Sequence, residues 1–413
     1  MKPKSQPDLV VGATGLAVAF SLFGDMAMYV IFPAQHAALG FSAIQVGLLL
    51  SVNRWIRLVT NQIAQRLIKR SSTGSAFPLA LTVGSLMAAG YAMAPSFSVL
   101  LLLRIVWGAC WSIIRHTGVM TTNNSAESGS RGRSMGIYMA LVNLGFVAGT
   151  FAAGWFYDWG GYQRAFLMAA VLSLAALPAA FVARKHTRSS FSQSGRMRRI
   201  SADSTAKNFE ENDTSDSEKF RLIPSVRDRF ESGNSRFPLS IQGFIISFVS
   251  SGLIMSTLGF MLRERYGDTV NIGTISIGVT ALTGMLLSIR SIINFAGLPA
   301  TGVVLDRIGF KKAQWIGFTV SGISLLAVAM FDTTTVMILM IVVFFTGAMI
   351  ARLAIESRAA QSGHRAYAAM ATSTDLGSAI GPMLGWLGIE LSQSGSVFWV
   401  GGILFLVAAW LNR

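Results

Sequence analysis

GLLLSVNRWIRLVTNQIAQRLIKR, residues 47–70, aligns without a gap on GMLLSIRSIINFAGLPATGVVLDR, residues 284–307, at a separation of 237 residues. A second stretch, RSMGIYMALVNLGFVAGT (133–150), aligns on RAYAAMATSTDLGSAIGP (365–382) at a separation of 232 residues. A different loop length between the two stretches accounts for the small change in separation. These alignments indicate an internal repeat, so the chain is interpreted as two similar halves.

The composition indicates that both halves lie in a membrane. Of the 413 residues, 52% are hydrophobic and 13% are charged, whereas about 25% are charged in an ordinary soluble domain. The mean hydropathy is +0.54. The net charge of +15 does not indicate a nucleic-acid-binding protein, because the basic residues lie at the ends of apolar runs and lack interleaved aromatic residues. We therefore expect an integral membrane protein.

A membrane-spanning helix needs about 20 mostly apolar residues, and the chain contains twelve such runs. Six precede and six follow a polar segment, 185–238, whose composition is typical of a disordered, solvated linker. The expected fold is therefore all-α, with twelve transmembrane helices in two pseudo-symmetric six-helix bundles, residues 1–184 and 239–413. The predicted spans are about 9–34, 43–66, 75–95, 98–119, 134–157, 163–183, 239–262, 274–300, 313–331, 334–353, 366–391 and 395–412.

The distribution of Lys and Arg predicts the orientation of these spans. With the N-terminus inside, the short inner loops hold twelve basic residues and the outer loops hold three. Because Lys and Arg concentrate in cytoplasmic loops, we expect both termini and the linker in the cytoplasm. A plasma membrane, in particular a bacterial inner membrane, is the expected location. The inner residues are Arg66, Lys69, Arg70, Arg115, Arg131, Arg133, Arg307, Lys311, Lys312, Arg352, Arg358 and Arg365, and the outer ones are Arg164, Arg263 and Arg265.

Three short motifs stand in or between the predicted spans. They are GVVLDRIGFKK (302–312), between the eighth and ninth spans, RIVWG (104–108) in the fourth span, and GSAIGPMLG (377–385) in the eleventh. The first is similar to the loop signature G-x-x-x-D-R-x-G-[RK]-[RK] of the major facilitator superfamily, and the others resemble its R-x-x-x-G element and its glycine-proline element. The resemblance, with the six-plus-six layout, implies a secondary transporter that moves a small solute by alternating access. The residues that match the loop signature are Gly302, Asp306, Arg307, Gly309, Lys311 and Lys312.

The resemblance also implies a role for this loop. In the family, the aspartate and arginine are thought to hold one conformation and to release in the other, so Asp306 and Arg307 are expected to form part of a conformational lock. The alternative is a solvated turn with basic residues that orient the chain. The corresponding loop of the first half has Lys69 where the aspartate would stand, and the fifth span has Thr150 where many antiporters of the family have proline.

Small residues recur at helical spacing in the fifth and eleventh spans. Gly145 and Gly149 are in the fifth, and Gly377 and Gly381 are in the eleventh. Because small residues allow membrane helices to approach closely, these four are expected to pack against neighbouring helices. Pro382 removes a backbone donor and is expected to bend the eleventh span.

Four arginines and two aspartates lie inside predicted spans and away from the ends of those spans. If each aspartate neutralises one arginine, about two positive charges remain near the middle of the membrane, where an ionisable residue usually faces a cavity or a partner. Arg54, Arg57 and Arg290 are therefore predicted to line a central cavity and to bind an anionic organic solute, since guanidinium is always charged and its fork fits carboxylate or phosphate. The alternative is that Arg57 extends to the inner surface and Arg54 pairs with a structural carboxylate.

The remaining embedded charges are candidates for proton coupling. Asp25 and Arg104 lie at a similar depth, and a carboxylate whose cationic partner moves away between conformations could bind and release a proton. The alternative is a fixed Asp25–Arg104 ion pair that braces the first and fourth spans. Asp375, near the middle of the eleventh span, is the second candidate.

Motifs of enzymes are missing from the sequence. It has no phosphate-binding glycine loop with lysine, no metal-ligand spacing and only four histidines. We therefore expect no catalytic activity, cofactor or metal, and transport driven by an ion gradient. The expected partners are a small-molecule solute, the proton and membrane lipid, without nucleic acid. Two alternatives remain: a drug efflux antiporter in which the arginines are structural, and a non-transporting scaffold or sensor that binds partners through residues 185–238.

Overall fold

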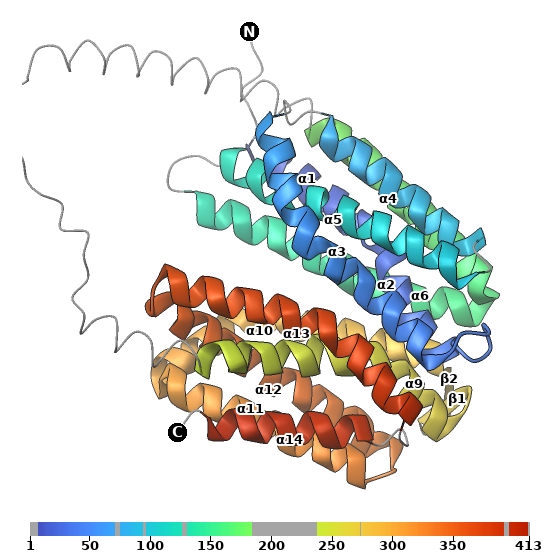
Figure 1. Cartoon of the computed structure of the whole chain (residues 1–413), viewed down its shortest axis with the longest axis vertical. Coiled ribbons are helices and arrows are strands. Elements are labelled where there is room, and N and C mark those ends of the chain that lie inside the picture. Colours follow the sequence, from blue (N-terminus) through green and yellow to red (C-terminus); the bar gives the residue numbers. More distant parts are fainter. Residues whose placement is uncertain are drawn as a thin grey trace, which may run out of the picture.

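In the computed structural model, residues 7–70, 75–93, 96–125, 130–183, 238–272, 274–391 and 396–411 are described. They form two helical bundles, one from each half of the chain (Figure 1). The first contains α1 (Pro7–Ser21), α2 (Phe23–Gln35), α3 (Ala43–Arg70), α4 (Ala76–Met93), α5 (Phe97–Ser125), α6 (Arg131–Leu174) and a helical segment at 176–183. The second contains a helical segment at 238–246, the π-helix η1 (Ser247–Ile254), α9 (Met255–Tyr266), β1 (Thr269–Ile272), β2 (Ile275–Gly278), α10 (Val279–Ile308), α11 (Phe310–Met330), α12 (Thr334–Gln361), α13 (His364–Leu391) and α14 (Ser396–Trp410).

Twelve helical crossings can be assigned within the described residues. Eight segments are long and apolar enough to span a membrane. One of them, Arg131–Ala183, has 53 residues and crosses twice, because Gly161 adopts a φ of 72° that breaks the helix. Helices α3, α13 and α14 supply the other three crossings; the first two carry more polar residues, and α14 has 15 residues. The predicted all-α, twelve-helix fold is confirmed.

The boundaries differ from the predicted ones in the outer loop before the eighth span. We expected that span to begin at 274, but residues 275–278 form β2, which pairs antiparallel with β1, and α10 begins at Val279. A short apolar run is compatible with either a strand or a buried helix, so the sequence pattern did not distinguish them. The predicted linker lies outside the described residues, except that Pro238 already belongs to a helix.

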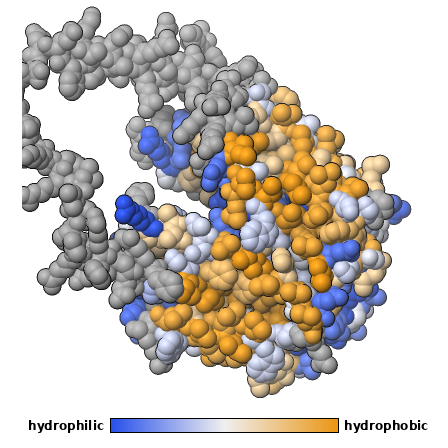
Figure 2. Space-filling view, in the orientation of Figure 1, coloured by the Kyte–Doolittle hydropathy of each residue, from blue (hydrophilic) through white to orange (hydrophobic). Residues whose placement is uncertain are grey.

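The outer surface of both bundles is apolar. Orange side chains cover most of the face shown in Figure 2, and large residues such as Leu86, Trp155 and Ile403 are more than half exposed. A soluble monomer rarely exposes such a continuous apolar surface. In a bilayer these side chains face lipid, which agrees with a membrane-spanning fold.

The two bundles contact each other at the end of the molecule that carries β1 and β2, here called the hairpin end. The opposite end, where residues 183 and 238 lie, is called the linker end (Figure 1). At the hairpin end, the side chain of Gln35 donates to Thr280 Oγ1 at 2.8 Å. Asp158 Oδ2 accepts from the backbone N–H of Ala281, in the first turn of α10, at 3.1 Å. The hairpin end is therefore closed by polar contacts between the halves.

The helices that pair across the interface are those of the repeat. Gly47 of α3 packs on Pro382 of α13, and Gly284 of α10 packs on Thr150 of α6, so closely that an added Cβ would meet backbone in both places. Gly47 and Gly284 are equivalent in the first alignment, and Thr150 and Pro382 are equivalent in the second. The interface is therefore pseudo-symmetric, with α3 against α13 on one side and α6 against α10 on the other.

The halves separate toward the linker end. Within the described ranges, the hydrogen bonds between the two bundles all lie at the hairpin end or in the middle of the molecule. Gln62 and Ile63, nearer the linker end of α3, are exposed. Figure 2 shows the surface hollowed between the bundles on this side. The structure is thus closed at the hairpin end and open at the linker end.

Candidate functional site

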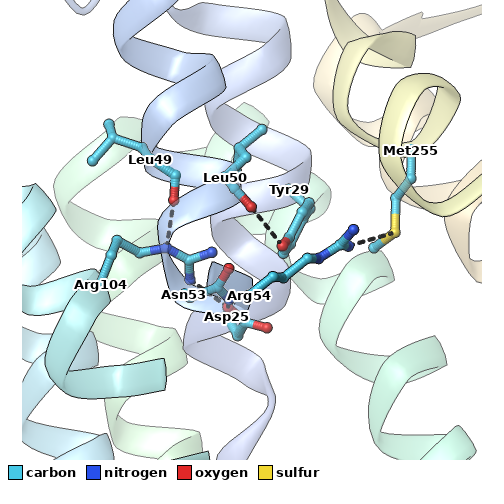
Figure 3. A network of polar contacts seen from close by, with 8 residues as sticks. All are labelled: Asp25, Tyr29, Leu49, Leu50, Asn53, Arg54, Arg104 and Met255. Atoms are coloured by element: carbon cyan, nitrogen blue, oxygen red, sulfur yellow. Dashed lines mark hydrogen bonds and ion pairs between the residues drawn. The ribbon is translucent and has the colours of Figure 1, made fainter. Parts of the chain in front are cut away.

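Arg54 of α3 extends from the first half to the second at the middle of the interface. Its Nη1 donates to the carbonyl oxygens of Ser251 and Ser378, at 2.9 and 2.5 Å. Its guanidinium lies 5.2 Å from the centre of the Tyr29 ring. Figure 3 shows the side chain pointing away from α3 toward Met255. Among the described residues, no carboxylate lies within ion-pair distance of Arg54.

Arg290 of α10 reaches the same place from within the second half. Its Nη2 donates to the hydroxyl of Ser251 at 2.9 Å, and its Nη1 lies 3.7 Å from the sulfur of Met255. Its guanidinium is 5.9 Å from the Phe345 ring. The positive charges of Arg352 and Arg54 repel the positive charge of Arg290. In the part of the chain that the structure describes, Arg290 also has no acidic partner within ion-pair distance.

The two arginines share their partners. The carbonyl of Ser251 accepts from Arg54 and its hydroxyl from Arg290, while the Met255 sulfur lies near both guanidinium groups. Ser251 belongs to η1, where the helix widens to π-helical hydrogen bonding, a feature often found at functional sites. The site is therefore built by residues of α3, α10, η1, α9, which begins at Met255, and α13, which contains Ser378.

Arg57 lies one turn from Arg54, toward the linker end of α3. Its Nε is buried and has no hydrogen-bond partner among the described residues. The charges of Arg115 and Arg54 repel it, and the charge of Asp375 on α13 attracts it. The Asp375 side chain is exposed and makes no ion pair within the described ranges. The middle of the interface thus carries an excess of positive charge.

Asp25 and Arg104, by contrast, form an ion pair inside the first half (Figure 3). The Arg104 side chain is completely buried, and that of Asp25 is 13% exposed. Arg104 Nε also donates to the carbonyl of Leu49 at 3.0 Å, and Asn53 donates to Asp25 at 3.4 Å. These contacts link α2, α3 and α5, which is the geometry of the bracing ion pair considered as an alternative from the sequence.

The loop signature lies at the linker end, between α10 and α11. Gly309 has a φ of 82°, a conformation that favours glycine, and it ends α10. Asp306 and Arg307 are exposed, and neither makes a hydrogen bond or an ion pair within the described residues. The exposed side chains of Lys311 and Lys312 follow in the first turn of α11, and Gly302 has open space around it.

The four glycines of the fifth and eleventh spans lie at contacts within each half. Gly145 packs on Ala19 of α1, and Gly149 on Met26 of α2. In the second half, Gly377 packs on the backbone at Phe244 and Gly381 on that at Gly252, and Pro382 lies inside α13. A side chain at these positions would separate the helices, because the nearest atoms are mostly backbone.

Four uncharged residues of the site and one aspartate at the hairpin end were not predicted from the sequence. These are Tyr29, Ser251, Met255 and Ser378, together with Asp158 at the hairpin end. Serine and methionine are common in membrane helices, so their types and spacing carry no signal of a site. Asp158 stood at the edge of a predicted span and was not recognised as a cap for a helix of the other half.

The comparison with protein families decides the identity of the fold. The family model described as Major Facilitator Superfamily matches residues 14–351. The chain belongs to this superfamily. It is therefore a multi-pass membrane protein of a transporter family, as the motifs implied, and a secondary transporter of small solutes. A search of curated protein sequences finds no match.

Solved structures of other transporters resemble this one over nearly its whole length. A POT family transporter in complex with 5-aminolevulinic acid is 15% identical, with a TM-score of 0.72, over 97% of this chain and 94% of that one. A mutant of the peptide transporter POT in complex with alafosfalin is 12% identical, with a TM-score of 0.74, over 98% and 93% of the two chains. At such low identity, these similarities show the shared fold alone.

Proposed function

We propose that this facilitator transports a small organic anion by alternating access, and that Arg54, Arg57 and Arg290 bind the anion. The observation that carries the proposal is the meeting of Arg54 and Arg290 on Ser251 and Met255, without an acidic partner in the described part of the chain. A guanidinium within the membrane is costly unless it is paired or faces water. A carboxylate or phosphate of the solute supplies such a partner with charge-assisted hydrogen bonds.

The contacts between the halves support alternating access. Arg54 donates hydrogen bonds to backbone carbonyls of η1 and α13, and Asp158 accepts one from the first turn of α10. Both contacts join the two halves, so both must break if the hairpin end opens. Asp306 is exposed at the open linker end. This exposure supports a lock that forms when the linker end closes. The distribution of Lys and Arg supports an orientation in which the linker end faces the cytoplasm.

Asp25 is the proposed proton site, with Asp375 as the second candidate. In this conformation Arg104 compensates the charge of Asp25, so protonation of Asp25 would leave Arg104 as a buried, uncompensated cation. A proton-coupled cycle therefore requires a second conformation in which the ion pair separates. Asp375 is exposed and is accessible to protons without such a separation.

Transport in proteoliposomes tests the proposed anion site. The solutes are benzoate, succinate and glycerol 3-phosphate, with tetraphenylphosphonium as a cationic comparison. Arg54→Gln and Arg290→Gln are each expected to weaken anion transport by about tenfold or more, since each removes charge-assisted hydrogen bonds to the solute. The control is Arg133→Gln, which removes an exposed arginine paired with an exposed Asp8 at 3.7 Å.

The same assay separates the alternatives. Transport of tetraphenylphosphonium alone, with equal rates in the two arginine variants, would favour the drug efflux antiporter. Deletion of most of residues 185–238, with a short tether retained, is expected to leave transport intact. A chain that transports nothing before or after this deletion, but binds a protein partner through the segment, would instead be a scaffold or sensor.

A further inference from the structure

We propose that the thioether of Met255 occupies the position of the solute's anionic group between Arg54 and Arg290, and that the anion displaces it. This inference rests on the proposed function and adds a residue that controls the affinity and selectivity of the site. Met255 is the first residue of α9, directly after η1, and it is 7% exposed. It lies on the side of the second half that the Arg54 side chain reaches (Figure 3).

Two cationic side chains approach the sulfur of Met255. Arg54 Nη2 lies 4.0 Å from the sulfur and Arg290 Nη1 lies 3.7 Å from it, so two cations from opposite halves approach one thioether. A thioether is only a weak hydrogen-bond acceptor. The contact therefore leaves both guanidinium groups poorly compensated, and an anionic oxygen at the same position would interact with each of them more favourably.

The other terminal nitrogens of the two arginines are already engaged. Arg54 Nη1 binds two backbone carbonyls, and Arg290 Nη2 binds the hydroxyl of Ser251. The nitrogens that approach Met255 are therefore the ones available to a solute. A group with at least two oxygens, such as a carboxylate, phosphate or sulfonate, can accept from both at about 2.7–2.9 Å. The expected ligand class is a small molecule with a compact oxyanion.

Methionine is suited to leave this position. Its unbranched side chain has three rotatable bonds and adapts to irregular space, so the sulfur can move while the backbone of α9 stays in place. An apolar solute gains little by displacing it, whereas an anion gains two charge-assisted contacts. Met255 thus weakens the binding of uncharged solutes, which must displace it without gaining charge-assisted contacts, and it favours anions at the same site.

Variants of Met255 test this inference in the full-length purified protein. Binding of sulfate, as a compact oxyanion probe, is measured by calorimetry against sodium chloride at equal ionic strength. Met255→Ala is expected to lower the Kd for sulfate by about threefold to tenfold, because no side chain has to be displaced. Met255→Leu, which nearly preserves volume, is expected to lie between Met255→Ala and the wild type. Met255→Glu is expected to abolish sulfate binding, because its carboxylate takes the position between the arginines.

The outcomes distinguish this inference from the proposed function. Unchanged sulfate affinity in the Ala and Leu variants, with sulfate binding retained in Met255→Glu, would overturn the role of Met255. If Arg54→Gln and Arg290→Gln still abolish binding in that case, the anion site stands without it. If the arginine variants also bind sulfate normally, the proposed anion site fails as well. Should Met255→Ala not fold, the Leu and Glu variants decide by the same criteria.

Discussion

Two regions of this transporter hold embedded arginines at the level of the Tyr29 ring, and they differ in how the charge is compensated. The guanidinium of Arg104 lies 5.6 Å from the centre of this ring and is paired with Asp25 inside the first half. Arg54 lies 5.2 Å from the same ring but binds backbone carbonyls of the other half. The paired arginine is sealed within one bundle, whereas the unpaired one connects the two bundles.

This difference assigns different tasks to similar residues. A charge pair inside one bundle does not have to break when the bundles move as rigid bodies, so it stabilises the first half in this conformation. Proton coupling at Asp25 would require a further change within that bundle that separates the pair. Contacts between the bundles must be exchanged in every transport cycle, and weakly compensated arginines can exchange backbone carbonyls for a solute. Breaking each region separately tests this comparison.

The largest effect is expected from breaking the buried pair. Asp25→Asn leaves the charge of Arg104 uncompensated, which costs about 3–5 kcal/mol for a buried pair and lowers the thermal unfolding temperature. The double variant Asp25→Asn/Arg104→Gln is expected to recover most of this loss. A wild-type unfolding temperature for Asp25→Asn would show that the pair contributes little in this fold. If the double variant folds, loss of its dependence on a pH gradient supports proton coupling at Asp25.

A smaller effect is expected from Arg54→Gln, which loses the bonds to Ser251 and Ser378. Loss of charge-assisted bonds of about 1.5–3 kcal/mol shifts the population away from the conformation open at the linker end. Spin labels at Gln62 and Thr372, both exposed on α3 and α13, measure this shift as shorter distances. The control Arg133→Gln should leave the distances unchanged, and equal distances in Arg54→Gln would remove its role as a contact between conformations.

Gly284→Ala tests whether the close approach of the halves matters apart from charge. The added Cβ meets the carbonyl oxygen of Thr150 and backbone at Gly154, so overpacking of about 1–3 kcal/mol is expected to open the hairpin end. Gly136→Ala is the matched control in α6, because nothing lies within 4 Å of its added Cβ. The same label pair measures both variants, and identical distances in the two would contradict the packing argument.

The smallest effect concerns His36, which follows α2 at the hairpin end. Its ring packs on Trp386 and Phe260, with ring centres 5.0 and 5.3 Å away. Burial is the main cause that lowers the pKa of His36 below its ordinary value of 6.5, and the charge of Arg263 also lowers it. The backbone at Pro33 and the charge of Glu390 oppose this shift. The neutral ring is therefore favoured in the folded protein.

A lowered pKa means that the unfolded chain binds the proton more readily. The contribution of His36 to stability is complete above about pH 6.5 and declines below it, by at most about 1.4 kcal/mol per pH unit. Unfolding temperatures at pH 7.5 and 5.5 check this, and His36→Phe is expected to lose less stability on acidification. An equal loss in the variant and the wild type would exclude His36 as the cause.

Much of the fold followed from local properties of the chain. The apolar runs predicted twelve crossings, and the repeat predicted that α3 resembles α10 and that α6 resembles α13. The structure adds that α3 pairs with α13 and α10 pairs with α6 across the interface, at Gly47 with Pro382 and at Gly284 with Thr150. The β1–β2 hairpin was missed because four-residue apolar strands have no periodicity that separates them from the start of a helix.

Only the charged residues of the site could be predicted from the sequence. Arg54 and Arg290 stood out because a charge in an apolar run is costly anywhere in a bilayer. Ser251, Ser378 and Met255 did not stand out, since neutral side chains and backbone carbonyls acquire a role only through the groups that approach them.

Hydropathy and charge are properties of each residue, so the order of the amino acids was enough to predict a membrane as solvent and twelve crossings. Electrostatic pairing instead depends on distances of a few ångströms between helices that are far apart in the chain. The arrangement of the helices in space was therefore needed to show that Asp25 compensates Arg104, and that Arg54 and Arg290 meet at a serine and a methionine.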